Sequence, residues 1–226
     1  MMDTFPIVAV AADAGDLEAV SELLSALPAQ CGAALIIVQH LDAGHERSPA
    51  ATIAKRTNLP VTPAHDGLEV TRHHVYLVPA NATVTVAGGH MRVTHKDKAS
   101  GKAGGLDHPG DTLFTSLAQE RGASAIGVVL SGAGADGALG VRAIKLAGGT
   151  TFAQYPGSAR FPSMPINAIE TECVGFVLRP YEIAHELARL GRLADAAAGV
   201  AGHTGVIDDT ASGPAGLVLA ACAQGA

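Results

Sequence analysis

Continuous apolar runs alternate with helical patterns along most of the chain. Runs at 5–11, 34–39 and 125–130 are typical of strands that are buried on both faces of a parallel sheet. After the first and the third of these runs, apolar residues recur at helical spacing, over 17–27 and 139–146. This alternation predicts an α/β fold, a doubly wound and mainly parallel sheet of the Rossmann-like, three-layer kind.

Shorter segments continue the same alternation. We predict further strands at 61–64, 150–153 and 174–178, and helices at 49–56, 112–121, 165–170 and 181–190. The aspartate at the start of the second of these helices, Asp111, is predicted to be its N-cap.

The pattern changes in the middle of the chain. The stretches 75–78, 83–86 and 91–94 are short, alternating or β-branched, and turn residues separate them. They predict a small antiparallel hairpin or meander that is inserted in the α/β chain. The polar, glycine-rich stretch 96–109 is predicted to be a loop.

The periodicity ends near residue 193. From there on the composition drifts to Ala, Gly, Asp and Thr without a sustained period. We therefore predict one α/β domain at 1–193 and a loosely structured, Ala/Gly-rich tail at 194–226.

Composition and charge argue against several classes of protein. The 226 residues carry a net charge of -6 and the pI is near 5.9, which argues against a nucleic-acid-binding surface. No apolar run approaches the roughly 20 residues that span a bilayer, and the N-terminus lacks the features of a signal peptide. Cysteines at 31, 173 and 222 form neither a disulfide framework nor a zinc pattern. These features predict a cytoplasmic protein without a membrane span.

Three polar residues stand at the predicted carboxyl ends of strands. Asp13 follows the first strand, His40 follows the second, and Asp136 lies in the glycine-rich turn after 125–130. Open α/β sheets bind ligands at this edge, and an imidazole between two acidic groups resembles a nucleophile, base and orienting triad. Taken singly, Asp13 and Asp136 are better explained as ordinary turn or helix N-cap residues, because aspartate is common there. This explanation is weaker for His40, which directly follows an apolar run.

Two further hypotheses, a dinucleotide cofactor and a zinc site, have less support in the sequence. Gly132, Gly134 and Gly137 have the spacing G-x-G-x-x-G of a dinucleotide-binding turn. This turn lies on a late strand, however, and residues 150–165 contain no acidic residue for a ribose. The ten histidines have no partners at the spacing of a zinc site. We therefore predict neither a cofactor nor a metal.

Several motifs together resemble one protein family. The stretches IVAVAADAGD (7–16), VQHL (38–41) and LSGAGADG (130–137), with shorter matches at 66–79 and 164–169, occur in unbroken order between about residues 5 and 192. They are similar to the bacterial chemotaxis methylesterases, the CheB family. This resemblance implies hydrolysis of glutamyl methyl esters and deamidation of glutamines on receptors by a Ser-His-Asp triad. It also implies a protein partner, a chemoreceptor or another signalling protein.

The resemblance assigns roles to the three candidate residues. His40 falls on the family histidine and Asp136 on the family aspartate, whereas Asp13 falls on the position of the nucleophilic serine. Two glycines of the family's first turn are Ala11 and Asp16 here, and a methionine that is frequent in the third motif is Ala133. Because the chain begins almost at its first strand, we expect no receiver domain and no regulation by phosphorylation within it.

The exchange of serine for Asp13 changes the expected chemistry. A carboxylate attacks acyl carbons poorly, and a second acid beside His40 favours an imidazolium, which cannot act as a general base. Loss of a triad nucleophile typically costs about 10⁶ in rate, so we predict weak or absent esterase activity. Two alternatives are a non-catalytic docking module with the same fold, and a hydrolase in which Asp13 attacks an alkyl carbon.

Overall fold

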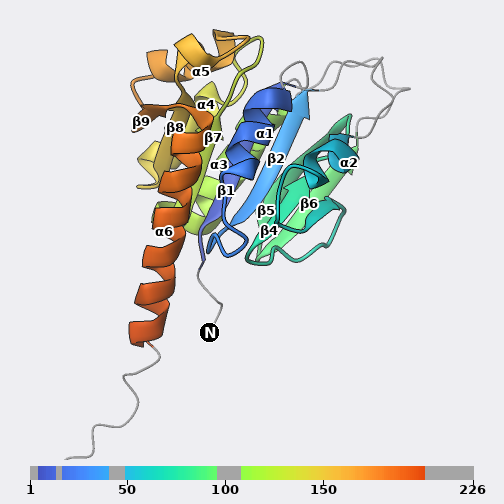
Figure 1. Cartoon of the computed structure of the whole chain (residues 1–226), viewed down its shortest axis with the longest axis vertical. Coiled ribbons are helices and arrows are strands. Elements are labelled where there is room, and N and C mark those ends of the chain that lie inside the picture. Colours follow the sequence, from blue (N-terminus) through green and yellow to red (C-terminus); the bar gives the residue numbers. More distant parts are fainter. Residues whose placement is uncertain (1–4, 14–16, 41–48, 96–107, 202–226) are drawn as a thin grey trace, which may run out of the picture.

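A computed structural model describes residues 5–13, 17–40, 49–95 and 108–201 of the chain. For His40, Pro49 and residues 198–201 it describes the backbone only. Within these ranges a parallel sheet lies between two layers of helices (Figure 1). The predicted doubly wound α/β fold with an inserted antiparallel hairpin is confirmed.

The described ranges contain one seven-stranded sheet and one two-stranded sheet. In spatial order, the larger sheet consists of β3 (Val61–Pro63), β4 (His74–Leu77), β2 (Ala34–His40), β1 (Ile7–Asp13), β7 (Ala125–Val129), β8 (Thr150–Gln154) and β9 (Phe176–Leu178), and every neighbouring pair is parallel. On one side of β1 the chain passes to β2, then to the edge strand β3, and returns inward to β4, which lies between β2 and β3. It then crosses to the other side and runs outward from β7 to β9. The reversal therefore lies between β1 and β7, and ligands of such sheets bind beside this switch point.

Alternate residues of the central strands supply the two apolar layers. In β1, Ala9 and Ala11 belong to one apolar cluster, whereas Val8 and Val10 belong to the other. The first cluster includes side chains of α3 (Pro109–Arg121), α4 (Ala138–Leu146) and α5 (Ser163–Glu170). The second includes side chains of α1 (Leu17–Ser25), α2 (Pro49–Ala54) and α6 (Pro180–Ala201). The sheet is covered on both faces, which explains the continuous apolar runs of its strands.

The inserted hairpin is smaller than the predicted meander. It consists of β5 (Ala82–Ala87) and β6 (His90–His95), which pair antiparallel. Residues 75–77 of the stretch 75–78, which we predicted as part of the same unit, belong instead to β4 and pair parallel with β2. Its alternation of side chains does not distinguish the two, because any strand has a period of two and only the pairing partner differs. The hairpin packs on α3, where Ser116 Oγ accepts the N–H of Val86 at 3.1 Å.

Helices α3 and α6 depart furthest from their predicted bounds. Helix α3 begins at Pro109, with His108 as its N-cap and no side-chain cap hydrogen bond, so the assignment of Asp111 as N-cap is wrong. Helix α6 continues to Ala201 instead of ending near 190. Residues 194–201, which we placed in the tail, are therefore helical, because alanine has the highest helix propensity and stabilises a helix without a polar–apolar period. The rest of the predicted tail, 202–226, lies outside the described residues.

Short 3-10 turns, Gly122–Ser124 and Pro156–Ser158, follow α3 and β8. None of the helices in the described ranges combines the length and the apolar composition that a membrane-crossing segment requires.

Candidate active site

The ends of β1 and β2 place two of the three predicted residues side by side. In the parallel register, the Cα atom of Asp13 is the partner of the Cα atom of His40. Neighbouring strands lie about 4.8 Å apart, so these two backbone positions are adjacent at the carboxyl edge of the sheet. The side chain of His40 lies outside the described residues, and its role stays a prediction.

The turn after β7 is hydrogen-bonded directly to the end of β1. Asp13 donates its backbone N–H to the carbonyl of Ser131 at 3.1 Å, and its carboxylate Oδ2 accepts the N–H of Ala133 at 3.2 Å. Gly132 lies between them, and a Cβ at this position would be only 3.0 Å from Asp13 Cβ and 2.1 Å from Met164 Sδ. A side chain at this position would therefore displace Met164 and crowd Asp13, which favours glycine.

Asp136 is buried and held by backbone amides. Its Oδ2 accepts the N–H of Gly110 at 2.8 Å, and its Oδ1 accepts the N–H groups of Asp111 and Gly137, both at 2.9 Å. Asp136 as a whole is only 3% exposed to solvent. Gly110 must lack a side chain, since a Cβ there would lie 2.8 Å from Asp136 Oδ2. The three donors fix this carboxylate in one orientation, as an orienting group of a triad requires.

Helix α5 supports the turn that carries Ala133 and Asp136. Asn167 Nδ2 donates to the carbonyl of Gly134 at 2.8 Å and to that of Ser163 at 2.9 Å. Met164 donates its backbone N–H to the carbonyl of Gly132 at 3.0 Å. Gly134 itself has a φ of +88°, which favours glycine. The turn is thus fixed from one side by β1 and from the other by α5.

A second carboxylate, that of Asp111, lies close to Asp136, and it is not among the three site residues predicted from the sequence. Asp111 Oδ1 accepts the N–H of Gly140 at 2.7 Å, near the start of α4. Burial raises the pKa of the Asp111 carboxyl above its usual value; the Gly140 N–H opposes this shift, and the negative charge of Asp136 adds to it. Asp111 lies on a different element from Asp136, so no spacing along the chain indicates that they meet.

His108 completes a cluster with these two acids. Its Nδ1 lies 3.9 Å from Asp136 Oδ1, and its side chain is exposed. One ligand atom from each of His108, Asp111 and Asp136 lies within 4.8 Å of the others. Backbone N–H groups already bind both oxygens of Asp136 and Oδ1 of Asp111, and these hydrogen bonds account for the arrangement without an ion. The expectation of no metal and no cofactor stays a prediction.

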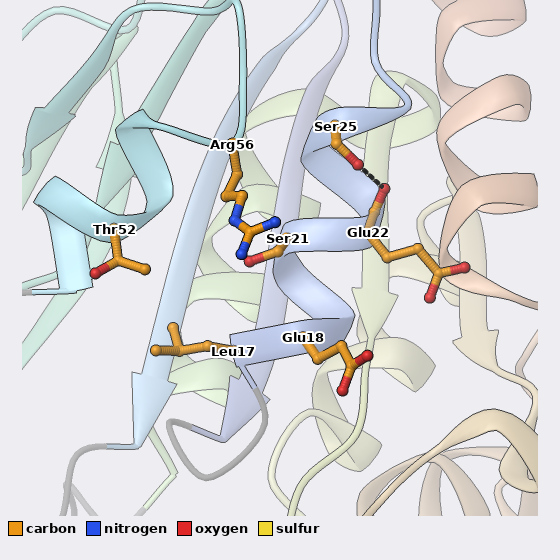
Figure 2. A pocket seen from close by; sticks show the side chains of 7 residues that line it. All are labelled: Leu17, Glu18, Ser21, Glu22, Ser25, Thr52 and Arg56. Atoms are coloured by element: carbon orange, nitrogen blue, oxygen red, sulfur yellow. Dashed lines mark hydrogen bonds between the residues drawn. The ribbon is translucent and has the colours of Figure 1, made fainter.

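A separate hollow lies on the other face of the sheet. A groove of about 530 Å³ is lined by residues of α1, among them Ser21, and by Thr52 and Arg56 from the α2 side (Figure 2). Among the described side chains, neither Asp13 nor Asp136 lines this groove. We therefore do not assign this groove to the candidate active site.

Comparisons with known proteins point to one family. The sequence model of a family described as CheB methylesterase matches residues 8–187. The chain is also 37% identical over 182 residues to the protein-glutamate methylesterase/protein-glutamine glutaminase 3 of Anaeromyxobacter dehalogenans, which covers 80% of this chain and 53% of that protein. A protein of the same name from Burkholderia thailandensis is 37% identical over 187 residues, 81% of this chain and 51% of its own length.

A solved structure has the same fold. The catalytic domain of the CheB methylesterase from Thermotoga maritima aligns with a TM-score of 0.72 and 26% sequence identity, covering 83% of this chain and 99% of that one. The chain spans about half the length of the two methylesterase/glutaminase relatives described above.

Proposed function

The chain belongs to the CheB methylesterase family, and from this premise we propose that it is a protein-glutamate methylesterase and glutaminase domain of chemotaxis-type signalling whose hydrolytic activity is weak or absent. Its partner would be a chemoreceptor or another signalling protein that presents glutamyl or glutaminyl side chains. One observation supports the loss of activity: the carboxylate of Asp13, next to His40 in the strand register, accepts the N–H of Ala133.

The chemistry of that carboxylate is unsuited to acyl transfer. A serine becomes a nucleophile when histidine removes its proton, whereas a carboxylate has no proton to remove and would form a labile anhydride. A backbone N–H in this position is also a donor to which a developing oxyanion could bind. The Ala133 N–H already donates to Asp13 Oδ2, so the carboxylate competes for a donor that the transition state would use.

The rest of the framework supports a retained binding role. Asp136 keeps three amide donors, and Asn167 keeps the turn in place. A family member with this geometry and without an efficient nucleophile would act by docking to its partner. This non-catalytic function is the second candidate, and the same observation on Asp13 favours it.

Methanol release from a methyl-esterified glutamyl peptide tests the proposal. We expect wild-type protein to release methanol at or near the uncatalysed rate. Asp13→Ser should raise the rate by at least about 10²-fold, a fraction of the ~10⁶ that a triad nucleophile contributes. Deamidation of a glutaminyl peptide, followed as ammonia release, should respond in the same direction.

Asp13→Ala is the matched control for this experiment. It removes the carboxylate without supplying a hydroxyl, so it should stay as inactive as wild type while keeping the fold. If wild-type protein releases methanol as fast as Asp13→Ser does, the proposed loss of activity is wrong.

An alternative mechanism would keep Asp13 as a nucleophile toward the methyl carbon of the ester. The methyl group would move to the Asp13 carboxylate, the substrate carboxylate would leave, and a water activated by His40 would then hydrolyse the new ester. Mass spectrometry of quenched wild-type protein distinguishes this route: a methyl adduct on Asp13 supports it, and an unmodified Asp13 with no methanol release rejects it.

A further inference from the structure

Beside the candidate active site, the molecule exposes a group of aromatic and cationic side chains. Tyr155 is 48% exposed, Phe161 36%, Ile166 39% and Tyr181 38%, and two arginines near them in the chain are also exposed. We name this group the arginine–aromatic rim, defined as Tyr155, Arg160, Phe161, Ile166, Arg179 and Tyr181. Aromatic residues and arginine are enriched in the cores of protein interfaces.

The backbone of the rim connects it to the carboxyl edge of the sheet. Tyr155 follows β8 and donates its N–H to the carbonyl of Leu178, the last residue of β9, at 2.7 Å. Arg179 follows Leu178 directly, and Tyr181 lies in the first turn of α6. Helix α5, which carries Ile166, lies at the same end of the sheet (Figure 1). The rim therefore lies on the β8–β9 side of the edge that holds Asp13.

Close packing and a hydrogen bond hold Tyr155 and the turn that follows it in one conformation. Gly157 lies so close to the Tyr155 ring that a Cβ there would be 2.6 Å from Tyr155 Cε1. Gln154 Nε2 donates to the carbonyl of Ser158 at 3.1 Å, which fixes the turn between them. A rigid aromatic side chain loses little conformational entropy when it binds a partner.

Phe161 joins the rim to the turn that contacts Asp13. Its carbonyl accepts the N–H of Gly132 at 2.9 Å, and its own N–H donates to Ser131 Oγ at 2.9 Å. The next amide after Gly132, that of Ala133, is the donor to Asp13 Oδ2. A partner that contacts Phe161 would therefore lie beside the candidate catalytic turn.

The charge of the rim is positive in an acidic chain. The guanidinium of Arg160 lies 5.3 Å from the centroid of the Phe161 ring, a cation–π geometry that leaves its charge exposed. Glu182, the acidic residue next to Tyr181, accepts the backbone N–H of Arg179 at 2.8 Å. Arg160 and Arg179 outnumber this one carboxylate in a chain whose net charge is -6, so the rim favours an acidic partner over a basic one.

We propose that the arginine–aromatic rim is the docking surface for the protein partner, and that the partner is an acidic segment in which glutamyl side chains flank apolar ones. This inference rests on the proposed function, because that function supplies a glutamyl-bearing partner. The aromatic side chains would cover the apolar residues, and Arg160 and Arg179 would pair with carboxylates beside the glutamyl group at the candidate site.

Binding can be measured separately from hydrolysis. The probe is a fluorescein-labelled helical peptide with leucines along one stripe and with glutamates around a single glutamyl methyl ester, titrated with full-length wild-type protein by fluorescence anisotropy. The double variant Arg160→Glu/Arg179→Glu should raise the Kd at least about tenfold, because two favourable charge pairs become repulsive. Phe161→Ala should also raise the Kd, and this change should persist at high salt.

The matched control reverses two cations elsewhere. Lys55→Glu/Arg56→Glu changes the net charge by the same amount at two exposed positions in the segment that joins α2 and β3, and should change the Kd less than about twofold. A peptide with lysines in place of the flanking glutamates should bind at least about tenfold more weakly than the acidic probe. The proposal would be overturned if the acidic and the lysine peptide bound with equal Kd, or if the two double variants lost affinity for the acidic peptide equally. A wild-type Kd above about 1 mM for the acidic peptide would also overturn it.

Kinetic measurements on Asp13→Ser protein test the rim separately from the proposed function. There the rim double variant should raise KM for methanol release from the same peptide and leave kcat unchanged, as expected for loss of uniform binding. Hydrolysis by Asp13→Ser with an unaltered KM in the rim variant would reject the rim and keep the function. Rim-dependent binding without any hydrolysis by Asp13→Ser would reject the proposal that Asp13 is what prevents hydrolysis, and would keep the rim.

Discussion

Backbone amides hold the charged side chains of the candidate site. Asp136 accepts N–H groups from Gly110 and Asp111, and Asp111 in turn accepts the N–H of Gly140. The two carboxylates thus bridge the starts of α3 and α4. Hydrogen bonds from backbone N–H groups stabilise a carboxylate that has lost contact with water. Asp111 therefore acts in this structure as a support for the Asp136 turn.

The raised pKa of Asp111 gives a testable pH dependence. Burial places its folded-state pKa above its unfolded-state value, so between these two values the native state binds the extra proton and stability falls as pH rises. Asp111→Asn keeps an oxygen for the Gly140 N–H and cannot ionise. We expect the free energy of unfolding of Asp111→Asn, relative to wild type, to increase from about pH 4 to neutral pH, where Asp111 is ionised.

Urea denaturation across that pH range measures this difference. Asp111→Ala is the comparison variant: it leaves the Gly140 N–H unsatisfied and should lose about 1–3 kcal/mol at neutral pH. A constant difference between Asp111→Asn and wild type at every pH would contradict the raised pKa.

At the scale of elements, close backbone contacts set how helices lie on the sheet. Gly140 of α4 packs against α3, where a Cβ would lie 2.4 Å from Phe114 Cβ. Gly191 of α6 packs against the turn before β2, where a Cβ would lie 2.0 Å from the carbonyl oxygen of Cys31. The salt bridge between Arg72 and Asp195 links the same part of α6 to the segment before β4. These contacts keep α6 ordered beyond the point at which its apolar period ends.

Gly191→Ala should therefore destabilise the protein although alanine is the better helix former. The added methyl group meets a backbone carbonyl that cannot rotate away, so we expect a loss toward the upper end of the about 1–3 kcal/mol typical of overpacking. Thermal and urea denaturation measure this loss.

Leu193→Ala tests whether the effect is specific to that contact. Leu193 lies on the same helix and is 55% exposed, so its truncation should change stability by less than about 0.5 kcal/mol. Similar losses in the two variants would show that the contact with Cys31 is not what fixes α6.

At the scale of the whole molecule, the two apolar layers share the same strands. Phe114 of α3 belongs to one layer and Leu23 of α1 to the other, and both are fully buried. Because alternate residues of β1 enter each layer, neither layer of helices can separate without exposing apolar side chains of strands on which the other layer also packs. The candidate site lies where loops from the two sides of the switch point meet, so its geometry depends on both layers.

This coupling predicts one cooperative unfolding transition. Phe114→Ala should cost about 3–5 kcal/mol and Leu23→Ala about 2–5 kcal/mol, and each should shift the whole transition to lower urea concentration. Far-ultraviolet circular dichroism and tyrosine fluorescence should give the same midpoint in each variant. Separate midpoints for the two probes, in either variant, would show that the layers unfold independently.

The sequence by itself determined the α/β class, the central strands and the family. Strands buried on both faces leave no polar period, so runs such as 34–39 are visible without any structure. The motifs around Asp13, His40 and Asp136 indicated the family because each is a short run of neighbouring residues that can be read along the chain. Local interactions determine such features, and a linear sequence records local interactions directly.

Only the tertiary structure decided which distant residues meet. It placed β4 in the parallel sheet, set Asp111 beneath Asp136, extended α6 to Ala201 and paired the Ala133 N–H with Asp13. Each of these depends on contacts between segments far apart in the chain, and no period or spacing encodes such a contact. The physical reason is that pairing partners and helix packing are chosen by the free energy of the whole assembled core, to which every element contributes.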